Sequence, residues 1–261
     1  MSVPLDDRGF LLGDGLFETV LWTGARLVLF DAHFARLARG CAALGLPTPD
    51  LERVRSCAFL ELENGGLRGV RSAVRFTWTA GGGGRGLDRP ERVEPRLYVT
   101  AQPAPPPVGP ARLVTASVRR NEFAPGSRLK TLAYVDQVAA RREARAAGAD
   151  EALMLNGRGE VACAAAANLF WFEGDRLVTP ALECGVLDGI VRRAVLAEAA
   201  EMGLETALVR VQRESLERAS GLFLTNSLIG VRPVSALDGV PVEPHRAEAA
   251  LGERVARAFE G

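Results

Sequence analysis

Residues 96–118 read RLYVTAQPAPPPVGPARLVTASV, and this stretch sets the organisation of the whole chain. Residues 96–101 alternate apolar and other side chains, which is typical of a strand in an antiparallel sheet. The segment Gln102–Pro110 holds five prolines. Because proline lacks a backbone N–H, this segment is neither a helix nor a central strand. It is predicted to be a stiff extended connector, with another strand near residues 112–118.

The residues before the connector, 1–104, are predicted to form a small N-terminal α/β lobe. Residues 16–30 fit two strands joined by a turn at Thr23-Gly24-Ala25, and Asp31 fits the cap of the helix that follows. The other elements expected in this lobe are a helix over residues 50–63 and a strand over residues 70–80.

Residues 105–110 are taken as the linker, and residues 111–261 as a larger C-terminal lobe. Strands are expected near residues 112–118, 151–156, 169–173 and 221–228, and helices over residues 133–147, over residues 188–202 and at the end of the chain. Strands and helices thus mix, with antiparallel hairpins at the front, which indicates an α+β fold in two lobes.

The composition is that of a globular protein and excludes several classes of function. The chain has 261 residues, 48% of them hydrophobic and 25% charged, with 32 basic and 32 acidic side chains. A net charge of zero leaves no basic field for nucleic acid or for an anionic membrane. No apolar run reaches the roughly 20 residues that span a bilayer. We therefore expect neither a nucleic-acid partner nor a membrane partner.

The first residues and the cysteines indicate a cytoplasmic location. The N-terminal stretch MSVPLDDRGF has neither the basic nor the apolar region of a secretory signal. Cys41, Cys57, Cys163 and Cys184 are widely spaced, with no CxxC pair. This pattern favours free thiols over disulfides or a zinc site.

A single lysine, Lys130, stands among 31 arginines. Arginine replaces lysine easily at a surface, but a guanidinium cannot become the neutral amine that attacks a carbonyl. Lys130 is therefore a candidate for imine chemistry. The alternative is a leftover surface lysine in a chain whose gene favours arginine codons.

Three features are candidates for binding an anion such as a phosphate. Asp188-Gly189-Ile190-Val191 begins a predicted helix, where free N–H groups and the helix dipole favour negative charge. Thr225-Asn226-Ser227 ends a predicted strand with three small hydrogen-bonding side chains. Arg36 is expected on the exposed side of its helix, from which it adds a charge-assisted contact or simply faces water.

Eight short motifs, spread over nearly the whole chain and in the right order, resemble those of the class IV (fold type IV) pyridoxal phosphate enzymes. They are Asp7–Phe10, Gly13–Thr19, His33–Leu37, Leu129–Leu132, Gly148–Ala152, Ala167–Phe170, Gly185–Ile190 and Thr225–Ser227. This family includes branched-chain aminotransferases, D-amino acid aminotransferases, R-selective amine transaminases and aminodeoxychorismate lyases.

The resemblance implies a two-lobed fold like that of D-amino acid aminotransferase, and a homodimer with the active site between the lobes and near the partner chain. It implies that pyridoxal 5'-phosphate is the cofactor and that the substrate is a small amino compound. Lys130 falls at the Schiff-base lysine, which also moves the proton at Cα. The positions implied to bind the cofactor, most of them at its phosphate, are Arg36, Cys163, Asn168, Ile190, Val191, Asn226 and Ser227.

Within the family, Gly83–Leu87 and Ala164–Trp171 look most like aminodeoxychorismate lyase, which releases pyruvate from 4-amino-4-deoxychorismate and leaves 4-aminobenzoate. Arg85 is the candidate for binding a substrate carboxylate, its alternative being a loop arginine that faces water. Leu87 stands where D-amino acid enzymes carry a histidine, which counts against that activity. An aminotransferase acting on D-amino acids, branched-chain amino acids or R-amines is the alternative.

Cys163 departs from the family, which places there a glutamate that pairs with the pyridine nitrogen. A neutral thiol is a weak partner, so the ring accepts electrons less well, which favours a lyase over a transaminase. A non-catalytic member of the family is the third possibility. Glu160 lies three residues earlier and is expected on the wrong side of the strand to replace the missing carboxylate.

The family has a short strand before its first motif, whereas the sequence given begins almost at Asp7. Either that strand is absent, in which case we expect an edge of the small-lobe sheet to lack a partner, or the start codon is misassigned.

Overall fold

The computed structural model describes the backbone of residues 2–260 and the side chains of residues 2–257. The chain divides into two compact units. The first holds the residues up to Pro105 together with Leu129–Ala133, and the second holds Pro106–Arg128 and the residues from Tyr134 onward. The segment of Lys130 therefore packs with the first unit, although the sequence on both sides of it belongs to the second.

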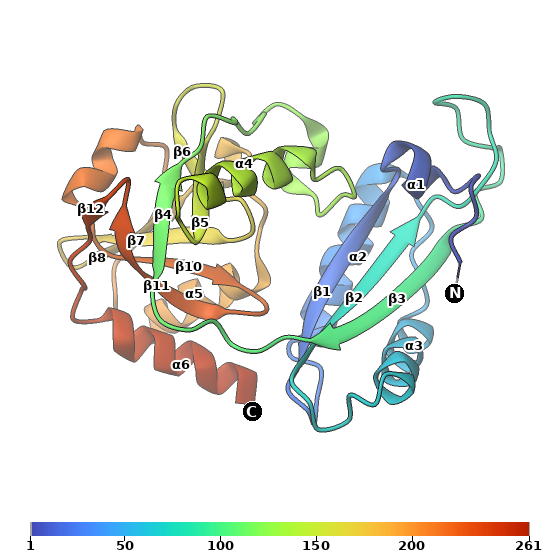
Figure 1. Cartoon of the computed structure of the whole chain (residues 1–261), viewed down its shortest axis with the longest axis horizontal. Coiled ribbons are helices and arrows are strands. Elements are labelled where there is room, and N and C mark those ends of the chain that lie inside the picture. Colours follow the sequence, from blue (N-terminus) through green and yellow to red (C-terminus); the bar gives the residue numbers. More distant parts are fainter. Residues whose placement is uncertain (1, 261) are drawn as a thin grey trace. The chain divides into compact units, whose positions relative to one another are not determined.

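The first unit is a three-stranded antiparallel sheet with two long helices (Figure 1). Its elements are α1 (Arg8–Leu12), β1 (Gly15–Trp22), α2 (Phe30–Leu44), α3 (Leu51–Asn64), β2 (Ser72–Thr79) and β3 (Arg96–Pro103). The strands lie in the order β1-β2-β3. The predicted helix over 50–63 and the strands over 70–80 and 96–101 are confirmed to within a few residues.

The hairpin predicted over residues 16–30 is wrong in its second half. After the turn, only a single bridge joins Trp22 to Leu27, and α2 begins at Phe30. Leu29, with φ 50°, is the cap, and Asp31 lies in the first turn of the helix instead. Phe30 enters the core as a helical residue beside α3, so burial of this ring overrides the strand-like alternation.

Alternation along β1 divides its side chains between two faces of the sheet. Leu16 packs in one cluster with Leu37 of α2, and Val20 packs in another with Val54 of α3. Both helices therefore cover the face of the even-numbered residues, and Glu18 is buried on that same face. Phe17 belongs to the opposite face of the strand.

The outer edge of β1 carries the segment of Lys130. The N–H of Phe17 donates to the carbonyl oxygen of Lys130 at 2.9 Å, and the N–H of Leu132 donates to that of Gly15 at 3.1 Å. The edge of β1 is thus partly paired, while β3 pairs with β2 alone among the strands described. Of the two edge strands of this sheet, β3 is therefore the one whose outer edge pairs with no other described strand.

The second unit is built on one nine-stranded mixed sheet with the order β6-β5-β4-β11-β10-β7-β8-β9, and β12 beside β11. The strands are β4 (Ala111–Thr115), β5 (Glu151–Leu155), β6 (Val161–Ala164), β7 (Asn168–Glu173), β8 (Arg176–Pro180), β9 (Thr206–Val209), β10 (Ser220–Asn226), β11 (Gly230–Leu237) and β12 (Val240–Pro241). The helices are α4 (Val135–Ala146), α5 (Ile190–Glu201) and α6 (Glu248–Glu260), with short 3-10 turns at Pro125–Arg128, Leu182–Cys184 and Arg213–Arg218.

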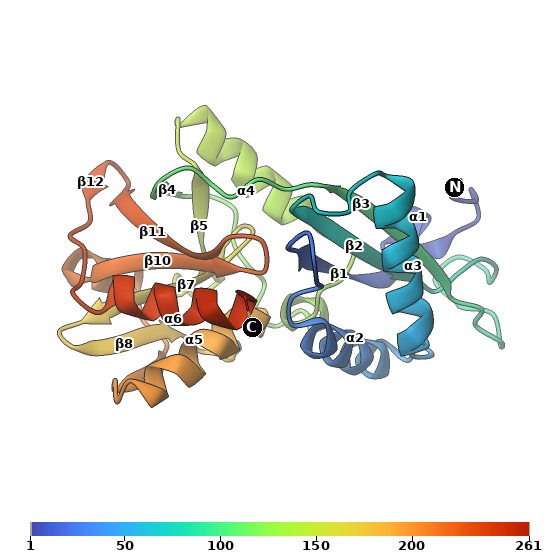
Figure 2. The same ribbon diagram turned by 90° about the horizontal axis from the view of Figure 1, so that it is seen from below.

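The helices of the second unit cover its sheet in two places. Ala140 and Ala144 of α4 pack against Ala152 and Met154 of β5, where small side chains let the helix approach closely. Helices α5 and α6 lie side by side (Figure 2), α5 packing on β10 and α6 on β11. No helix among the described residues is both long and apolar enough to cross a membrane.

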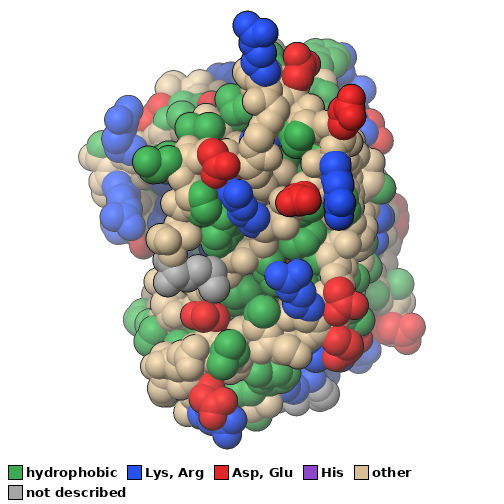
Figure 3. Space-filling view, turned by 90° about the vertical axis from the view of Figure 1, so that its right-hand side faces the viewer, with side chains coloured by type: hydrophobic (Ala, Val, Ile, Leu, Met, Phe, Trp, Pro, Cys, Tyr) green, Lys and Arg blue, Asp and Glu red, His purple; other side chains and the backbone are tan. Residues whose placement is uncertain are grey.

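The surface carries charges of both signs. In the face shown in Figure 3, Lys and Arg side chains are interspersed with Asp and Glu rather than gathered by sign. This agrees with the net charge of zero.

Candidate functional site

Lys130 is half-buried, and its ammonium nitrogen lies 4.1 Å from the centre of the Phe17 ring. The guanidinium carbon of Arg75 lies 3.6 Å from the centre of the same ring. Burial lowers the pKa of Lys130 to about 8; Glu18 acts in the opposite direction, and Arg36 and Arg75 lower the pKa further. At pH 7 about one amine in ten is then neutral, against about one in three thousand for an ordinary lysine.

Glu18, Arg36 and His33 form a closely bonded triad between β1 and α2. Arg36 donates from Nε to one carboxylate oxygen at 2.8 Å and from Nη2 to the other at 2.6 Å. His33 Nδ1 lies 2.7 Å from the second oxygen. Burial would raise the pKa of Glu18, but the bonds from Arg36 and then His33 outweigh it and lower the pKa to about 2.

The prediction that Arg36 lies on the exposed side of its helix is wrong. Its side chain is 11% exposed, against 2% for Glu18. Burial lowers the pKa of His33, although its bond to Glu18 opposes this. An ionised Glu18 therefore faces a charged Arg36 and a mainly neutral His33.

Arg85 lies on an exposed loop of the first unit. It is distant in sequence from Glu18, His33 and Arg36, and the bonds that hold those three residues together do not involve it. The backbone N–H of Arg85 donates to the carbonyl oxygen of Asp88, and the N–H of Asp88 donates to that of Arg85, both at 3.1 Å. The buried guanidinium of Arg8 orders this glycine-rich loop by donating to the carbonyl oxygens of Gly83, Gly86, Leu87 and Asp88. The loop is thus a built structure with Arg85 on its outside, and a substrate role for Arg85 stays a prediction.

In the second unit, α5 begins at Ile190 without a side-chain cap, because its cap residue is Gly189. Ile190 and Val191 are buried, and first-turn N–H groups have no acceptor within their own helix. Asn168 donates from Nδ2 to the carbonyl oxygen of Leu187 at 2.9 Å, which fixes the turn before the helix. A Cβ on Gly189 would lie 2.0 Å from Asn168 Oδ1, so the two residues are closely packed.

The end of β10 places Thr225, Asn226 and Ser227 in succession. The side-chain amide of Asn226 stabilises the turn that follows β10. Its Nδ2 donates to the carbonyl oxygen of Ala166, and its Oδ1 accepts from the N–H groups of Leu228 and Ile229. Thr225 is 1% exposed. Its hydroxyl is one of the buried polar atoms for which the described part of the chain supplies no hydrogen-bond partner.

Cys163 is buried in β6, paired with Met154 of β5. Burial raises the pKa of its thiol; Arg120 opposes this and Glu151 adds to it. Glu160 accepts from Asn156 at 2.7 Å and from Arg210 at 2.9 Å. Cys163 is therefore a neutral thiol, and Glu160 is already engaged elsewhere.

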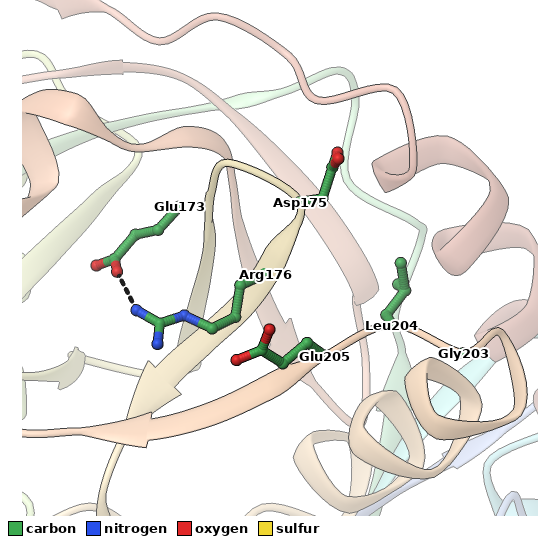
Figure 4. Close-up of a pocket in the computed structure, with 6 residues that line it drawn as sticks. All are labelled: Glu173, Asp175, Arg176, Gly203, Leu204 and Glu205. Atoms are coloured by element: carbon green, nitrogen blue, oxygen red, sulfur yellow. Dashed lines mark hydrogen bonds and ion pairs between the residues drawn. The ribbon is translucent and has the colours of Figure 1, made fainter.

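A surface pocket of about 530 Å³ opens elsewhere on the second unit (Figure 4). It is lined by Glu173, Asp175, Arg176, Gly203, Leu204 and Glu205. Within it Arg176 donates to Glu173 at 2.7 Å. The lining contains none of the predicted site residues, so this pocket is not the candidate site.

The predicted residues thus divide between the two units. Lys130, Arg36 and Arg85 lie in the first, and Lys130 and Arg36 share the neighbourhood of Glu18. The second unit holds Cys163, Asn168, Ile190, Val191, Asn226 and Ser227. Sequence reasoning missed Glu18 and Arg75 as charged neighbours of Lys130. The signal for Glu18 was a charge at a position that alternation places among buried apolar residues.

Comparisons with known proteins show which family and which enzymes the chain resembles. A family model described as Amino-transferase class IV matches residues 15–237. An aminodeoxychorismate lyase from Bacillus subtilis (strain 168) is 29% identical over 238 residues, which cover 90% of this chain and 81% of the relative. A Methanocaldococcus jannaschii protein with the provisional name of a branched-chain-amino-acid aminotransferase is 31% identical over 244 residues, covering 91% and 83%.

Among solved structures, the crystal structure of 4-amino-4-deoxychorismate lyase from Pseudomonas aeruginosa is 30% identical, with a TM-score of 0.89. The match covers 100% of this chain and 97% of that one. Similar proteins thus carry two enzyme names, and the likeness extends over the full chain.

Proposed function

Because the chain belongs to the class IV aminotransferase family, which has the fold type IV architecture and depends on pyridoxal phosphate, we propose that it is the lyase of that family. The proposed reaction releases pyruvate from 4-amino-4-deoxychorismate and leaves 4-aminobenzoate. The observation that carries the proposal is Lys130: the single lysine of the chain, bound to the edge of β1, with a pKa lowered to about 8.

Features of both units fit the cofactor. In the first, the guanidinium of Arg36 is held in a fixed plane by its two bonds to Glu18. In the second, the uncapped start of α5 offers N–H groups, and the buried hydroxyl of Thr225 has no partner among the residues described. A fixed guanidinium, N–H groups at a helix start and a buried hydroxyl suit a phosphate.

Each residue has a proposed task. The cofactor, when bound, supplies an aldehyde carbon to which amines add and a pyridine ring that accepts electron density from the neighbouring carbon. Lys130 is the residue that would hold the cofactor at that aldehyde carbon. Its Nζ then takes the proton from the carbon that bears the substrate amine and returns a proton to the departing enolpyruvate as pyruvate leaves.

The phosphate is assigned to Arg36, the N–H groups of Ile190 and Val191, and the hydroxyl of Ser227. Asn168 and Asn226 are assigned to shaping the turns that present these groups, because their amides bond to neighbouring backbone. Arg85 is proposed to bind a substrate carboxylate.

Cys163 supports the lyase over the aminotransferase. A neutral buried thiol cannot keep a proton on a ring nitrogen as a carboxylate does. Amino-group exchange depends strongly on the electron-accepting power of the ring, whereas elimination passes the electron pair to a leaving group. The lyase names among its relatives point the same way.

The test is to incubate the full chain, loaded with pyridoxal phosphate, with 4-amino-4-deoxychorismate. The proposal expects 4-aminobenzoate and pyruvate in equal amounts, and neither from the Lys130→Ala variant. Product formation that survives in Lys130→Ala contradicts the role of the lysine.

The second candidate is an aminotransferase, which the Methanocaldococcus jannaschii relative favours by its name. Exchange of an amino group between leucine or D-alanine and 2-oxoglutarate, without formation of 4-aminobenzoate, would establish it. A protein inert in both assays would be the non-catalytic member to which Cys163 also points.

A homodimer in the cytoplasm is proposed on the family resemblance. Light scattering on the purified chain tests the homodimer, because a dimer has twice the mass of the 27.8 kDa chain.

A further inference from the structure

Glu18 is the one charged residue among the even-numbered positions of β1, beside Leu16, Val20 and Trp22. These positions face α2 and α3, where the side chains are buried. Burying a carboxylate is costly unless it is paired and hydrogen-bonded. A leucine at this position would keep the sheet without that cost, so packing alone does not account for Glu18.

The bonds to Glu18 fix the plane of one guanidinium. Arg36 donates Nε and Nη2 to the two carboxylate oxygens, at 2.8 and 2.6 Å. Such a paired geometry sets orientation as well as charge. His33, one turn earlier on α2, contacts the second oxygen at 2.7 Å and fixes the carboxylate in turn.

Glu18 is also coupled to Lys130. Its neighbour Phe17 donates its N–H to the carbonyl oxygen of Lys130 and lies beneath the ammonium. Among the charged groups around the lysine, Glu18 favours the ammonium form, while Arg36 and Arg75 oppose it. The carboxylate of Glu18 thus forms hydrogen bonds with the guanidinium of Arg36 and acts on the amine of Lys130 electrostatically.

We propose that Glu18 is a positioning residue, which holds Arg36 in the orientation that binds the phosphate of the cofactor. The inference rests on the proposed function, because it assumes that Arg36 meets this phosphate. Glu18 itself touches neither substrate nor cofactor in this account, and acts through Arg36 alone when the cofactor binds.

The first test uses Glu18→Gln in the full chain, with binding of pyridoxal phosphate measured by equilibrium dialysis. The amide keeps the size of the side chain but cannot accept both N–H groups of Arg36. The dissociation constant should rise about ten- to a hundredfold. Glu173→Gln is the matched control, because Glu173 also accepts from an arginine and a second side chain, in the other unit. It should bind as the wild type does.

A double-mutant cycle separates positioning from general support of the fold. In an Arg36→Lys background the ammonium cannot form the paired contact, so Glu18→Gln should have little further effect on binding. A purely structural role for Glu18 would weaken binding equally in both backgrounds and would overturn the proposal.

The pKa of Lys130 gives a second readout, taken before cofactor is added. The chain has a single lysine, so reductive methylation with carbon-13 gives one side-chain signal beside that of the N-terminal amine. Loss of the Glu18 charge should lower the pKa of Lys130. An unchanged pKa, together with unchanged cofactor binding, overturns the proposal.

Glu18→Asp decides the case if Glu18→Gln fails to fold. Aspartate keeps the charge but is too short for the paired contact with Arg36, so cofactor binding should still weaken. Binding by a folded Glu18→Asp at wild-type strength overturns the proposal. Failure of the wild type itself to bind pyridoxal phosphate would instead overturn the proposed function and, with it, the role of Glu18.

Discussion

The backbone N–H of Phe17 donates to the carbonyl oxygen of Lys130 at 2.9 Å, joining residues 113 positions apart in the sequence. Through this bond and that of Leu132 with Gly15, the segment of Lys130 pairs with the edge of β1. The short segment that holds the single lysine therefore belongs to the first unit, with Glu18 and Arg36, although the sequence on both sides of it belongs to the second. A covalent role for Lys130 needs such a fixed position as much as it needs the lowered pKa.

Replacing Lys130 by methionine should stabilise the cofactor-free chain at neutral pH. The folded state lowers the pKa of this lysine from 10.5 to about 8, so below pH 8 the folded chain carries a disfavoured charge. Since the unfolded chain holds its proton up to pH 10.5, the stability of the wild type rises between pH 8 and 10.5. The advantage of Lys130→Met should be at most about 3 kcal/mol at pH 7.

Urea unfolding of both chains at pH 7 and pH 10 measures this difference. The gap between the variant and the wild type should shrink at the higher pH. A gap that is independent of pH would mean that the pKa of Lys130 is not lowered by folding.

Glu18 should make the stability of the first unit sensitive to acid. Its pKa falls from 4.5 to about 2 on folding, so its contribution is present above pH 4.5 and is lost as the pH falls towards 2. The difference in unfolding free energy between the wild type and Glu18→Gln should therefore narrow by up to about 3 kcal/mol over that range. Denaturant titrations at pH 5, 4, 3 and 2 test this, and a constant difference would contradict it.

Gly189→Ala should destabilise the second unit and weaken cofactor binding together. The added methyl would lie 2.0 Å from Asn168 Oδ1 and 3.3 Å from Arg192 Cβ, so the turn before α5 must move. A cost of about 1–3 kcal/mol is expected for such overpacking. Gly252→Ala is the control: among the described residues its methyl would meet Val231 alone, at 3.8 Å, and alanine should stabilise α6 by about 0.5–1 kcal/mol. Equal effects of the two variants on thermal unfolding would refute the packing argument.

The four thiols should differ sharply in reactivity. Burial raises the pKa of Cys41 and Cys184 to about 11, and raises that of Cys163 as well. Cys57 is only half-buried. Titration with Ellman's reagent should find one reactive thiol in the native chain and four in guanidinium chloride. Rapid labelling of Cys163 in the native chain would show that it is not the buried neutral thiol described.

Local signals predicted the elements with the clearest chemistry. The helix predicted over residues 50–63 is α3, and the structure shows that Asp50 caps it by accepting from the N–H of Arg53 at 2.7 Å. Gly189 likewise precedes α5. The strands β6, β8, β9, β11 and β12 escaped prediction, because all but β11 are only two to five residues long and β11 contains Pro233. The place of β11 in the sheet depends in part on pairing with β4, which is distant in the sequence.

The sequence predicted those site residues whose type alone marks them, and it missed the contact between side chains that only the fold brings together. Lys130 stands out in composition alone. The burial of Arg36 could not be seen from its helix, because a long charged side chain next to an apolar stripe normally reaches water. Its partner Glu18 lies on a strand 18 residues earlier, and only the packing of α2 on β1 brings them together.

The central claim is that Lys130 binds pyridoxal phosphate covalently, and borohydride reduction of the cofactor-loaded chain followed by peptide mass spectrometry tests it most directly. The account predicts one reduced pyridoxyl group per chain, on the peptide that contains Lys130, and none on the Lys130→Ala variant. A chain that takes up no label, or that carries the label only on its N-terminal amine, would contradict the account.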